Sequence, residues 1–134
     1  MKITADTNVL IRVLVGDDAE QSKAAESALK KAEVVAISIS ALCELVWVLS
    51  RGYRTSAVNI AASIRHLISA SNAVVDRPAA EAGLALLDAG GDFADGVIAH
   101  EGNWLGADTF VSFDKKAVKL IEASGGLARL AGTG

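Results

Sequence analysis

The chain has 134 residues, of which 51% are hydrophobic and 22% are charged, and its net charge is −3. This composition excludes a disordered or collagen-like chain, and the length predicts a single domain over residues 1–134 that buries roughly two-thirds of its unfolded surface. The acidic total argues against a protein that coats nucleic acid, although one basic rim is enough to meet phosphates. With one cysteine, Cys43, neither an intrachain disulfide nor a cysteine-based zinc site can form.

The chain shows no signal for export or for the membrane. Its first residues, MKITADTN, lack the apolar segment of a signal peptide. Charged residues or glycines interrupt every apolar stretch well before the roughly 20 residues that span a bilayer. We therefore expect a cytoplasmic protein without membrane contact.

Hydrophobic periodicity predicts strands that alternate with helices in the first part of the chain. Ser40 and Thr55 are the expected N-caps of two of these helices, and Gly52 the expected end of the first of the two. The predicted strands cover 1–5, 33–38 and 73–75, and the predicted helices cover 8–15, 17–32, 41–51 and 56–70.

The second part continues the same alternation, with a break at Gly90-Gly91 after its first helix. We expect a helix from 76–78 to about 88, then helices over 93–104 and 114–124 and strands over 109–112 and 127–130. Alternating elements of this kind predict a mostly parallel central sheet with helices on both faces.

Four acidic residues stand at or near the ends of these elements: Asp6, Glu44, Asp95 and Asp114. Sites in parallel α/β sheets form beyond the carboxyl ends of the strands, so the fold is able to gather residues that are far apart in sequence. A cluster of carboxylates repels itself unless a cation lies inside it, and carboxylate oxygens are ligands that Mg²⁺ and Mn²⁺ prefer. The pattern therefore predicts a divalent-metal hydrolase.

Each acid also has a structural interpretation. Asp114 is placed to cap the helix that follows it, and Asp92 with Asp95 resembles a capping box. Asp6 suits a turn after a strand, and Glu44 is either a solvated surface residue or a carboxylate that needs a partner beside an apolar stripe. The conjunction of all four favours the metal site.

Four segments in this order resemble a PIN domain, and in particular the toxin of a VapBC-type toxin–antitoxin pair. They are ADTNVLIRVLVGDD, ISISALCELVWVLSRGY, DFADGVIA and TFVSFDKKAVKL, which together cover nearly the whole chain. The resemblance implies a three-layer α/β/α fold and a metal-dependent endoribonuclease. The chain departs from the family pattern at Gly96, where a bulkier residue is common, and in the HEGNW stretch at 100–104.

The resemblance also implies the roles of individual residues. Asp6, Asp95 and Asp114 match metal ligands, and Glu44 matches a ligand or a base that orients water. The supporting positions are Thr7, Asn8, Ser112 and the further acid Asp92, whose role as a cap is equally open. The implied cofactor is Mg²⁺ or Mn²⁺, which lowers the pKa of a bound water for in-line attack on phosphorus.

The implied partners are an RNA substrate, a VapB-like antitoxin and a second copy of the chain. Lys115, Lys116 and Arg12 are the candidate RNA contacts, each with a purely structural alternative. With aromatics at 4% no stacking platform of the single-strand-binding type is expected, so RNA selection rests on shape and phosphate position. Trp47, Leu49, Tyr53 and the apolar face of 56–70 are a candidate antitoxin groove, or else part of the core or of a homodimer interface.

Other functional classes fit less well. A receiver-like signalling domain needs a pair of acids after the first strand, where Asp6 stands alone. No G-x-G-x-x-G follows a strand, which excludes dinucleotide binding. A metal-independent ribonuclease would use His66 and His100, and a catalytically inactive PIN-like RNA- or protein-binding module remains the closest rival.

Overall fold

The structure is a computed structural model that describes residues 1–132. Contacts within the chain divide it into two compact units, the first covering Met1–Asp76 and the second beginning at Arg77. Within residues 1–132 every helix is too short or too polar to span a bilayer.

The first unit is built on a parallel sheet of three short strands. They are β1 (Lys2–Thr4), β2 (Val34–Ala36) and β3 (Ala73–Val74), in the spatial order β1-β2-β3. The register pairs Ile3 with Val35, and the backbone amide of Ala5 donates to the carbonyl of Ala36 at 3.0 Å. Chain segments that leave β1 and β2 therefore emerge at the same edge of the sheet.

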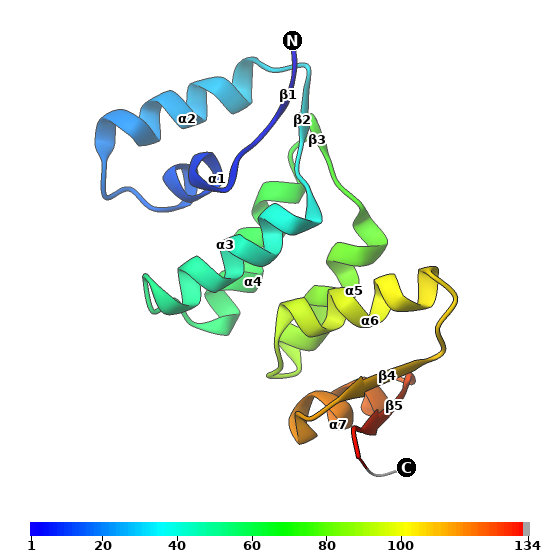
Figure 1. The fold of residues 1–134 in the computed structure, drawn as a ribbon. Helices are drawn as coiled ribbons and strands as arrows, with labels where there is room; N and C mark the ends of the chain where they lie inside the picture. Colours follow the sequence, from blue (N-terminus) through cyan, green and yellow to red (C-terminus); the bar gives the residue numbers. More distant parts are fainter. Residues whose placement is uncertain (133–134) are drawn as a thin grey trace. The chain divides into compact units, whose positions relative to one another are not determined.

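Four helices accompany this sheet (Figure 1): α1 (Thr7–Leu14), α2 (Ala19–Lys31), α3 (Ile39–Arg51) and α4 (Ala57–Ile68). Helix α1 packs against both α2 and α3, and α3 packs against α4. The side chains of Leu10, Leu42, Leu45, Ile60 and Ile64 are almost completely buried and form the centre of the core.

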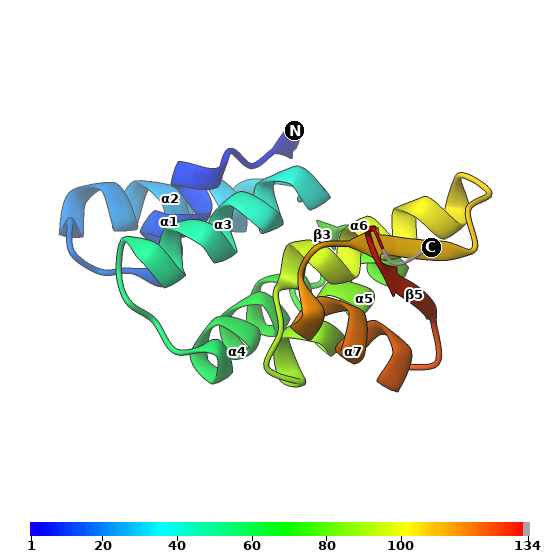
Figure 2. The same ribbon diagram turned by 60° about the horizontal axis from the view of Figure 1, so that its bottom comes forward.

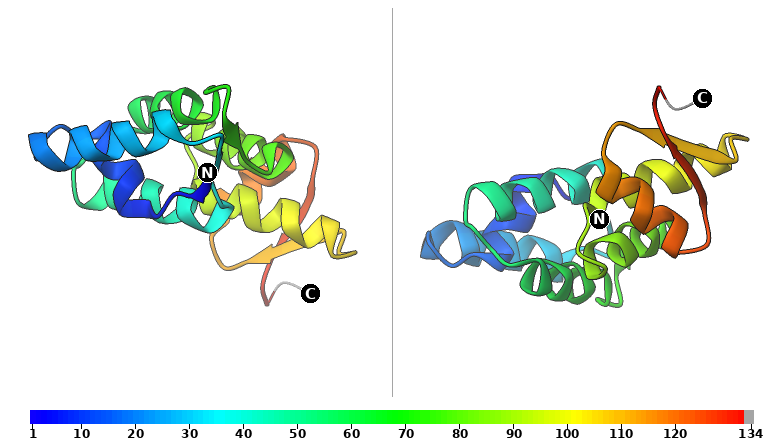
Figure 3. Two further views of the ribbon diagram at one scale, coloured as in Figure 1. Left: turned by 90° about the horizontal axis from the view of Figure 1, so that it is seen from above. Right: turned by 90° about the horizontal axis from the view of Figure 1, so that it is seen from below.

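The second unit begins with two helices, α5 (Arg77–Asp88) and α6 (Phe93–Trp104), which run side by side (Figure 3). Strand β4 (Thr109–Ser112), helix α7 (Lys115–Ala123) and strand β5 (Leu127–Leu130) follow. The two strands pair in parallel, and Figure 2 shows α7 beside β5. Phe93 is fully buried, and the position of Gly83 leaves room for its ring.

These elements confirm the predicted α/β class and match an α/β/α architecture with parallel strands. Two predicted N-caps are wrong. Ser38 caps α3 in place of Ser40, and Ser56 caps α4 in place of Thr55. In both cases the serine hydroxyl accepts a hydrogen bond from the backbone amide three residues later, at 3.1 Å and 3.2 Å.

Candidate active site

Asp6 and Glu44 line one open hollow of about 350 Å³ in the first unit. Asp6 lies two residues beyond the end of β1, and Glu44 lies in the second turn of α3, which begins shortly after β2. Both carboxylates are exposed. The lining residues are Thr4, Ala5, Asp6, Thr7, Ser38, Ser40, Ala41 and Glu44.

The parallel pairing of β1 and β2 explains why these two acids share a hollow. Both strands run in the same direction and end at the same edge, which is where parallel α/β proteins place their sites. Asp6 is the first residue after Ala5, whose amide still bonds to β2. The apolar stripe of α3 is buried in the core, so Glu44 on the other side faces solvent.

Asp6 is also the N-cap of α1. Its Oδ1 atom accepts a hydrogen bond from the backbone amide of Thr7 at 2.8 Å, and Thr7 itself is buried. Asn8 is exposed in the first turn of the same helix. The main-chain amide of Thr7 therefore orients the Asp6 carboxylate.

The second unit brings Asp92, Asp95 and Asp114 into electrostatic contact. Asp92 caps α6 by accepting from the amide of Ala94 at 3.0 Å, and Asp95 lies in the first turn of that helix. Partial burial raises the pKa of Asp95 above its ordinary value, and the negative charges of Asp92 and Asp114 raise it further. A cation near these three carboxylates would relieve that repulsion.

Asp114 follows β4 and caps α7. Its Oδ1 atom accepts from the amides of Lys116 and Ala117 at 2.9 Å and 3.2 Å. The amide of Asp114 in turn donates to the Ser112 hydroxyl at 3.0 Å, so Ser112 positions the main chain at this acid. Ser112 therefore contacts the main chain of the candidate ligand Asp114.

The capping interpretation is therefore correct for Asp92 and Asp114, and Asp6, which the sequence places in a turn, is a helix cap as well. Asp6, Asp92 and Asp114 each cap a helix through Oδ1 alone. In the part of the chain that the structure describes, the Oδ2 atoms of these three residues accept no hydrogen bond. One oxygen of each carboxylate thus remains available to a ligand.

The sequence-predicted quartet is divided between the two units. Asp6 and Glu44 belong to the first, and Asp95 and Asp114 belong to the second. Among residues 1–132 no group of three or more acidic, histidine or cysteine side chains stands together as a ready-made metal cage. The donor chemistry nevertheless fits a hard divalent cation, because every candidate side chain offers carboxylate oxygen.

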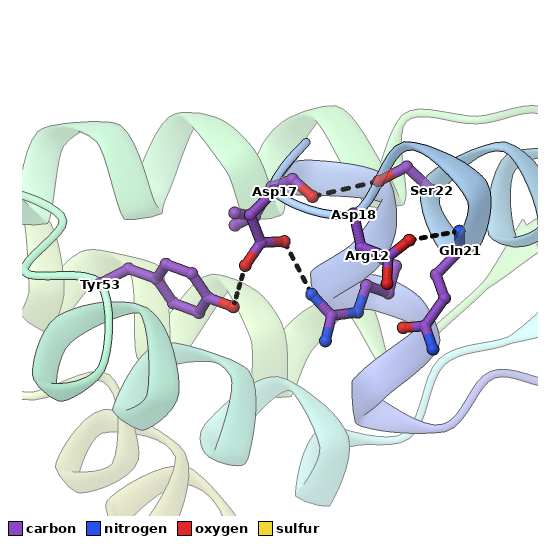
Figure 4. A network of polar contacts seen from close by, with 7 residues as sticks. Arg12, Asp17, Asp18, Gln21, Ser22 and Tyr53 are labelled. Atoms are coloured by element: carbon purple, nitrogen blue, oxygen red, sulfur yellow. Dashed lines mark hydrogen bonds and ion pairs between the residues drawn. The ribbon is translucent and has the colours of Figure 1, made fainter.

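The candidate RNA contacts differ in what surrounds them. Lys115 and Lys116 are exposed in the first turn of α7, immediately after Asp114. Arg12 instead donates to Asp17 at 2.7 Å, and the Tyr53 hydroxyl donates to the other oxygen of Asp17 at 3.1 Å (Figure 4). Arg12 therefore has a structural role, linking the end of α1 to the connection between α1 and α2.

The histidines of the metal-independent alternative lie within helices, as the sequence predicts. His66 is exposed in α4 of the first unit, and His100 is half-buried in α6 of the second.

Sequence reasoning missed Ser38 and Ser40 as neighbours of the candidate site. Both line the hollow with Asp6 and Glu44, whereas the sequence predicts only a cap for Ser40. The signal was present for Ser38, since it is the last residue of the second predicted strand.

The departure at Gly96 also has a structural reason. A Cβ atom at this position would lie 2.3 Å from the backbone oxygen of Ala82 in α5. Glycine here allows α6 to approach the α5 backbone closely, and Asp95 is its immediate neighbour. Gly96 therefore helps to fix the position of a candidate ligand.

Comparison with known families places the chain in a nuclease class. The PIN domain family matches residues 3–122, and the chain therefore belongs to the PIN domain family. Members of this family are generally metal-dependent nucleases that act on nucleic acid. The comparison with curated proteins gave no match.

Proposed function

We propose that this protein is an Mg²⁺- or Mn²⁺-dependent endoribonuclease, with Asp6, Glu44, Asp95 and Asp114 as its metal-binding residues. The observation that carries the proposal is the hollow at the edge of the β1–β2 pair, where Asp6 and Glu44 are both exposed. Paired carboxylates at the carboxyl ends of parallel strands suit metal-assisted hydrolysis, and membership of the PIN family supports the same chemistry.

The residues present fit a divalent ion. The carboxylates of Asp6 and Asp114 are held by the helix amides that they cap, and each keeps its second oxygen available. Asp95 lies near the negative charges of Asp92 and Asp114, which favour a cation. When bound, Mg²⁺ or Mn²⁺ lowers the pKa of a coordinated water and neutralises phosphate charge.

The reaction is hydrolysis of a phosphodiester bond. Water adds to phosphorus in line, the bond to the ribose 3′-oxygen breaks, and the products carry a 5′-phosphate and a 3′-hydroxyl. Glu44 acts either as a ligand or as the base that accepts the proton of the attacking water. Thr7 and Ser112 hold the main chain at Asp6 and Asp114, and Lys115 and Lys116 are placed to contact substrate phosphates.

The proposal further includes the role of toxin in a type II toxin–antitoxin pair, acting in the cytoplasm as a single-domain homodimer. An antitoxin Arg or Lys entering the acidic site would neutralise it. The candidate groove is smaller than the sequence predicts, because Leu49 and the apolar face of α4 are buried. The exposed part is confined to Trp47, Tyr53 and Val58.

The decisive experiment is cleavage of total cellular RNA by the purified protein with Mg²⁺ or Mn²⁺, beside an EDTA control. We expect discrete fragments that disappear with EDTA and in an Asp6→Asn variant. Asparagine at position 6 still caps α1, so the variant should remain folded. The matched control is Asp18→Asn, which makes the same chemical change at the N-cap of α2, outside the hollow, and should keep full activity.

The other results would each point to a different function. Cleavage that survives EDTA would exclude the metal mechanism and direct attention to His66 and His100. RNA binding without cleavage by any variant would identify the catalytically inactive binding module.

A further inference from the structure

Helix α3 presents one narrow exposed face that begins at the candidate site. Its residues Ser40, Glu44, Trp47 and Arg51 are all exposed, and Ser40 and Glu44 line the hollow. At 3.6 residues per turn these four positions lie within an arc of about 60° around the helix axis. The face therefore runs from the proposed metal-binding residue Glu44 to an indole and then to a guanidinium.

Trp47 stands alone on this face as a large apolar group. Its side chain is 63% exposed. Its neighbours one turn away in either direction are Cys43, Glu44, Ser50 and Arg51, none of which is a large apolar residue. A partner helix that docks through apolar contacts needs a continuous stripe of anchors, which α3 does not offer, so the Trp47 part of the candidate antitoxin groove is a poor site for such a helix. A flat, isolated ring flanked by polar groups suits the face of a nucleobase.

Arg51 supplies a positive charge beside the ring. It lies one turn beyond Trp47, in the last turn of α3, and no ion pair or hydrogen bond engages its guanidinium within residues 1–132. By helix geometry the α-carbons of Trp47 and Arg51 lie about 4.5 Å and about 10.5 Å from that of Glu44 along the axis. A guanidinium binds phosphate through two parallel hydrogen bonds, so Arg51 complements the backbone of a bound strand.

We propose that Trp47 stacks on an unpaired base next to the scissile phosphate and that Arg51 binds a neighbouring phosphate. The inference rests on the proposed function, because it takes Glu44 as part of the active site. A base inside a duplex is already stacked on both faces and cannot offer one to the indole. The low aromatic content predicted no stacking platform, but a single exposed ring beside the site is enough for one base.

The two tryptophans of the chain allow a matched test. Trp104, at the end of α6, is 85% exposed and lies outside the proposed contact, so Trp104→Ala controls for loss of an exposed indole. The probe is a fluorescein-labelled single-stranded RNA of mixed sequence, or the same strand annealed to its complement. Binding is measured in Mg²⁺ on the Asp6→Asn background, which keeps the RNA intact, and cleavage is measured separately with Asp6 restored.

We expect Trp47→Ala to weaken single-strand binding by about tenfold, since stacking on an aromatic side chain contributes ~1–3 kcal/mol per base. Trp47→Phe should restore most of the affinity, and Trp104→Ala should change it by less than about twofold. In a Trp104→Phe variant, where Trp47 is the remaining indole, the single strand should quench tryptophan fluorescence and the duplex should not.

Equal affinity of Trp47→Ala and its parent for the single strand would overturn the inference and assign the indole to a protein interface. A drop that is equal for single strand and duplex would also overturn it, because stacking on an unpaired base requires a difference. If the Trp47 effect on binding is present but no variant cleaves RNA, the stacking site stands and the proposed catalysis fails. If RNA is cleaved but Trp47→Ala has no effect on binding, the proposed catalysis stands and the stacking site fails.

Discussion

At the scale of single residues, helix capping and metal binding make compatible demands on a carboxylate. Asp6 and Asp114 each use Oδ1 to satisfy an amide at a helix N-terminus, which fixes the orientation of the whole carboxyl group. Such a side chain meets a cation with little further loss of rotamer freedom. A cap at the end of a strand is thus a means of preparing a ligand, and the two interpretations drawn from the sequence are parts of one arrangement.

Two substitutions at Asp114 separate these roles. Asparagine keeps an oxygen for the amides of Lys116 and Ala117, so Asp114→Asn should lose cleavage while the melting temperature stays nearly unchanged. Asp114→Ala removes the cap as well and should lower stability by about 1 kcal/mol. Thermal unfolding in EDTA together with RNA cleavage measures both effects. Equal destabilisation by the two variants would show that the cap contributes nothing.

Asp95 makes stability depend on pH. Its pKa is raised in the folded protein by burial and by the charges of Asp92 and Asp114, so the folded state favours the neutral carboxyl. The stabilisation that the neutral Asp95 carboxyl gives the folded state is fully present below the unfolded-state pKa of about 3.9. It is lost as the pH rises through the raised pKa of the folded state. Ionised Asp95 therefore destabilises the metal-free protein at neutral pH.

Asp95→Asn should accordingly be more stable than the parent at neutral pH in EDTA. The gain should be at most about 1 kcal/mol, since these groups are largely solvated, and it should vanish below about pH 4. Thermal unfolding of Asp95→Asn and of the parent protein in EDTA, measured from about pH 4 to neutral pH, tests the prediction. A gain that does not change with pH would mean that packing, and not charge, separates the two proteins.

At the scale of helices and strands, most of the alternation was predictable and the exact caps were not. Ser38 and Ser40 are chemically equivalent caps, and the end of β2 decides between them. Ile37 is buried and its amide still bonds to the carbonyl of Val74 beyond the end of β2, so Ser38 is the first residue free to cap α3. The amide of Thr55 bonds to the carbonyl of Leu49 at 2.9 Å and so still belongs to the end of α3, and Ser56 is the residue that caps α4.

The solvent exposure of Glu44 likewise could not be decided from the local sequence. Its neighbours Leu45 and Val46 are buried, and a hydrophobic segment suggests a carboxylate that must find a partner. The helix instead turns its apolar stripe inward and leaves Glu44 in solvent. The distinction depends on which face of α3 meets α1 and α4, and that is a property of the tertiary structure.

The contact between α5 and α6 depends on Gly96. In Gly96→Ala the new Cβ would lie 2.3 Å from the Ala82 backbone oxygen, so the two helices must separate. We expect a loss of about 1–3 kcal/mol, together with reduced cleavage because Asp95 moves with its helix. Denaturant unfolding gives the first value and an RNA assay the second.

Gly102→Ala is the control for Gly96→Ala, since it makes the same change in the same helix. A Cβ at position 102 meets nothing within 4 Å, so the substitution should be neutral or stabilise by up to about 1 kcal/mol through helix propensity. Similar effects at both positions would contradict the packing explanation.

The Arg12–Asp17–Tyr53 contacts link three parts of the first unit: the end of α1, the α1–α2 connection and the residue after the C-cap of α3. Asp17→Ala removes both hydrogen bonds. Because the side chain of Asp17 is 47% exposed, the cost should be about 1 kcal/mol or less. Arg12→Ala should show a similar loss of stability with little change in RNA affinity, as measured by thermal unfolding and fluorescence anisotropy. A large loss of RNA affinity would restore Arg12 as a substrate contact.

At the scale of the whole molecule, the sequence predicts one domain, whereas contacts within the chain define two compact units. Local patterns identify helices and strands, but they carry little information about how contacts are distributed between distant segments. The proposed function requires ligands from both units: Asp6 and Glu44 from the first, and Asp95 and Asp114 from the second. Cooperativity and metal binding are therefore the properties that test the single-domain prediction.

A divalent ion that binds only the folded protein should raise the unfolding temperature of the whole chain. At an Mn²⁺ concentration about 100 times its Kd, the gain should be about 2.7 kcal/mol, in one calorimetric transition whose van't Hoff and calorimetric enthalpies agree. Asp6→Asn and Asp114→Asn should each abolish this shift, and Asp18→Asn should keep it. If only one of the two site variants loses the shift, the ion depends on the carboxylates of that unit alone. Two separate transitions would show that the chain unfolds as two domains.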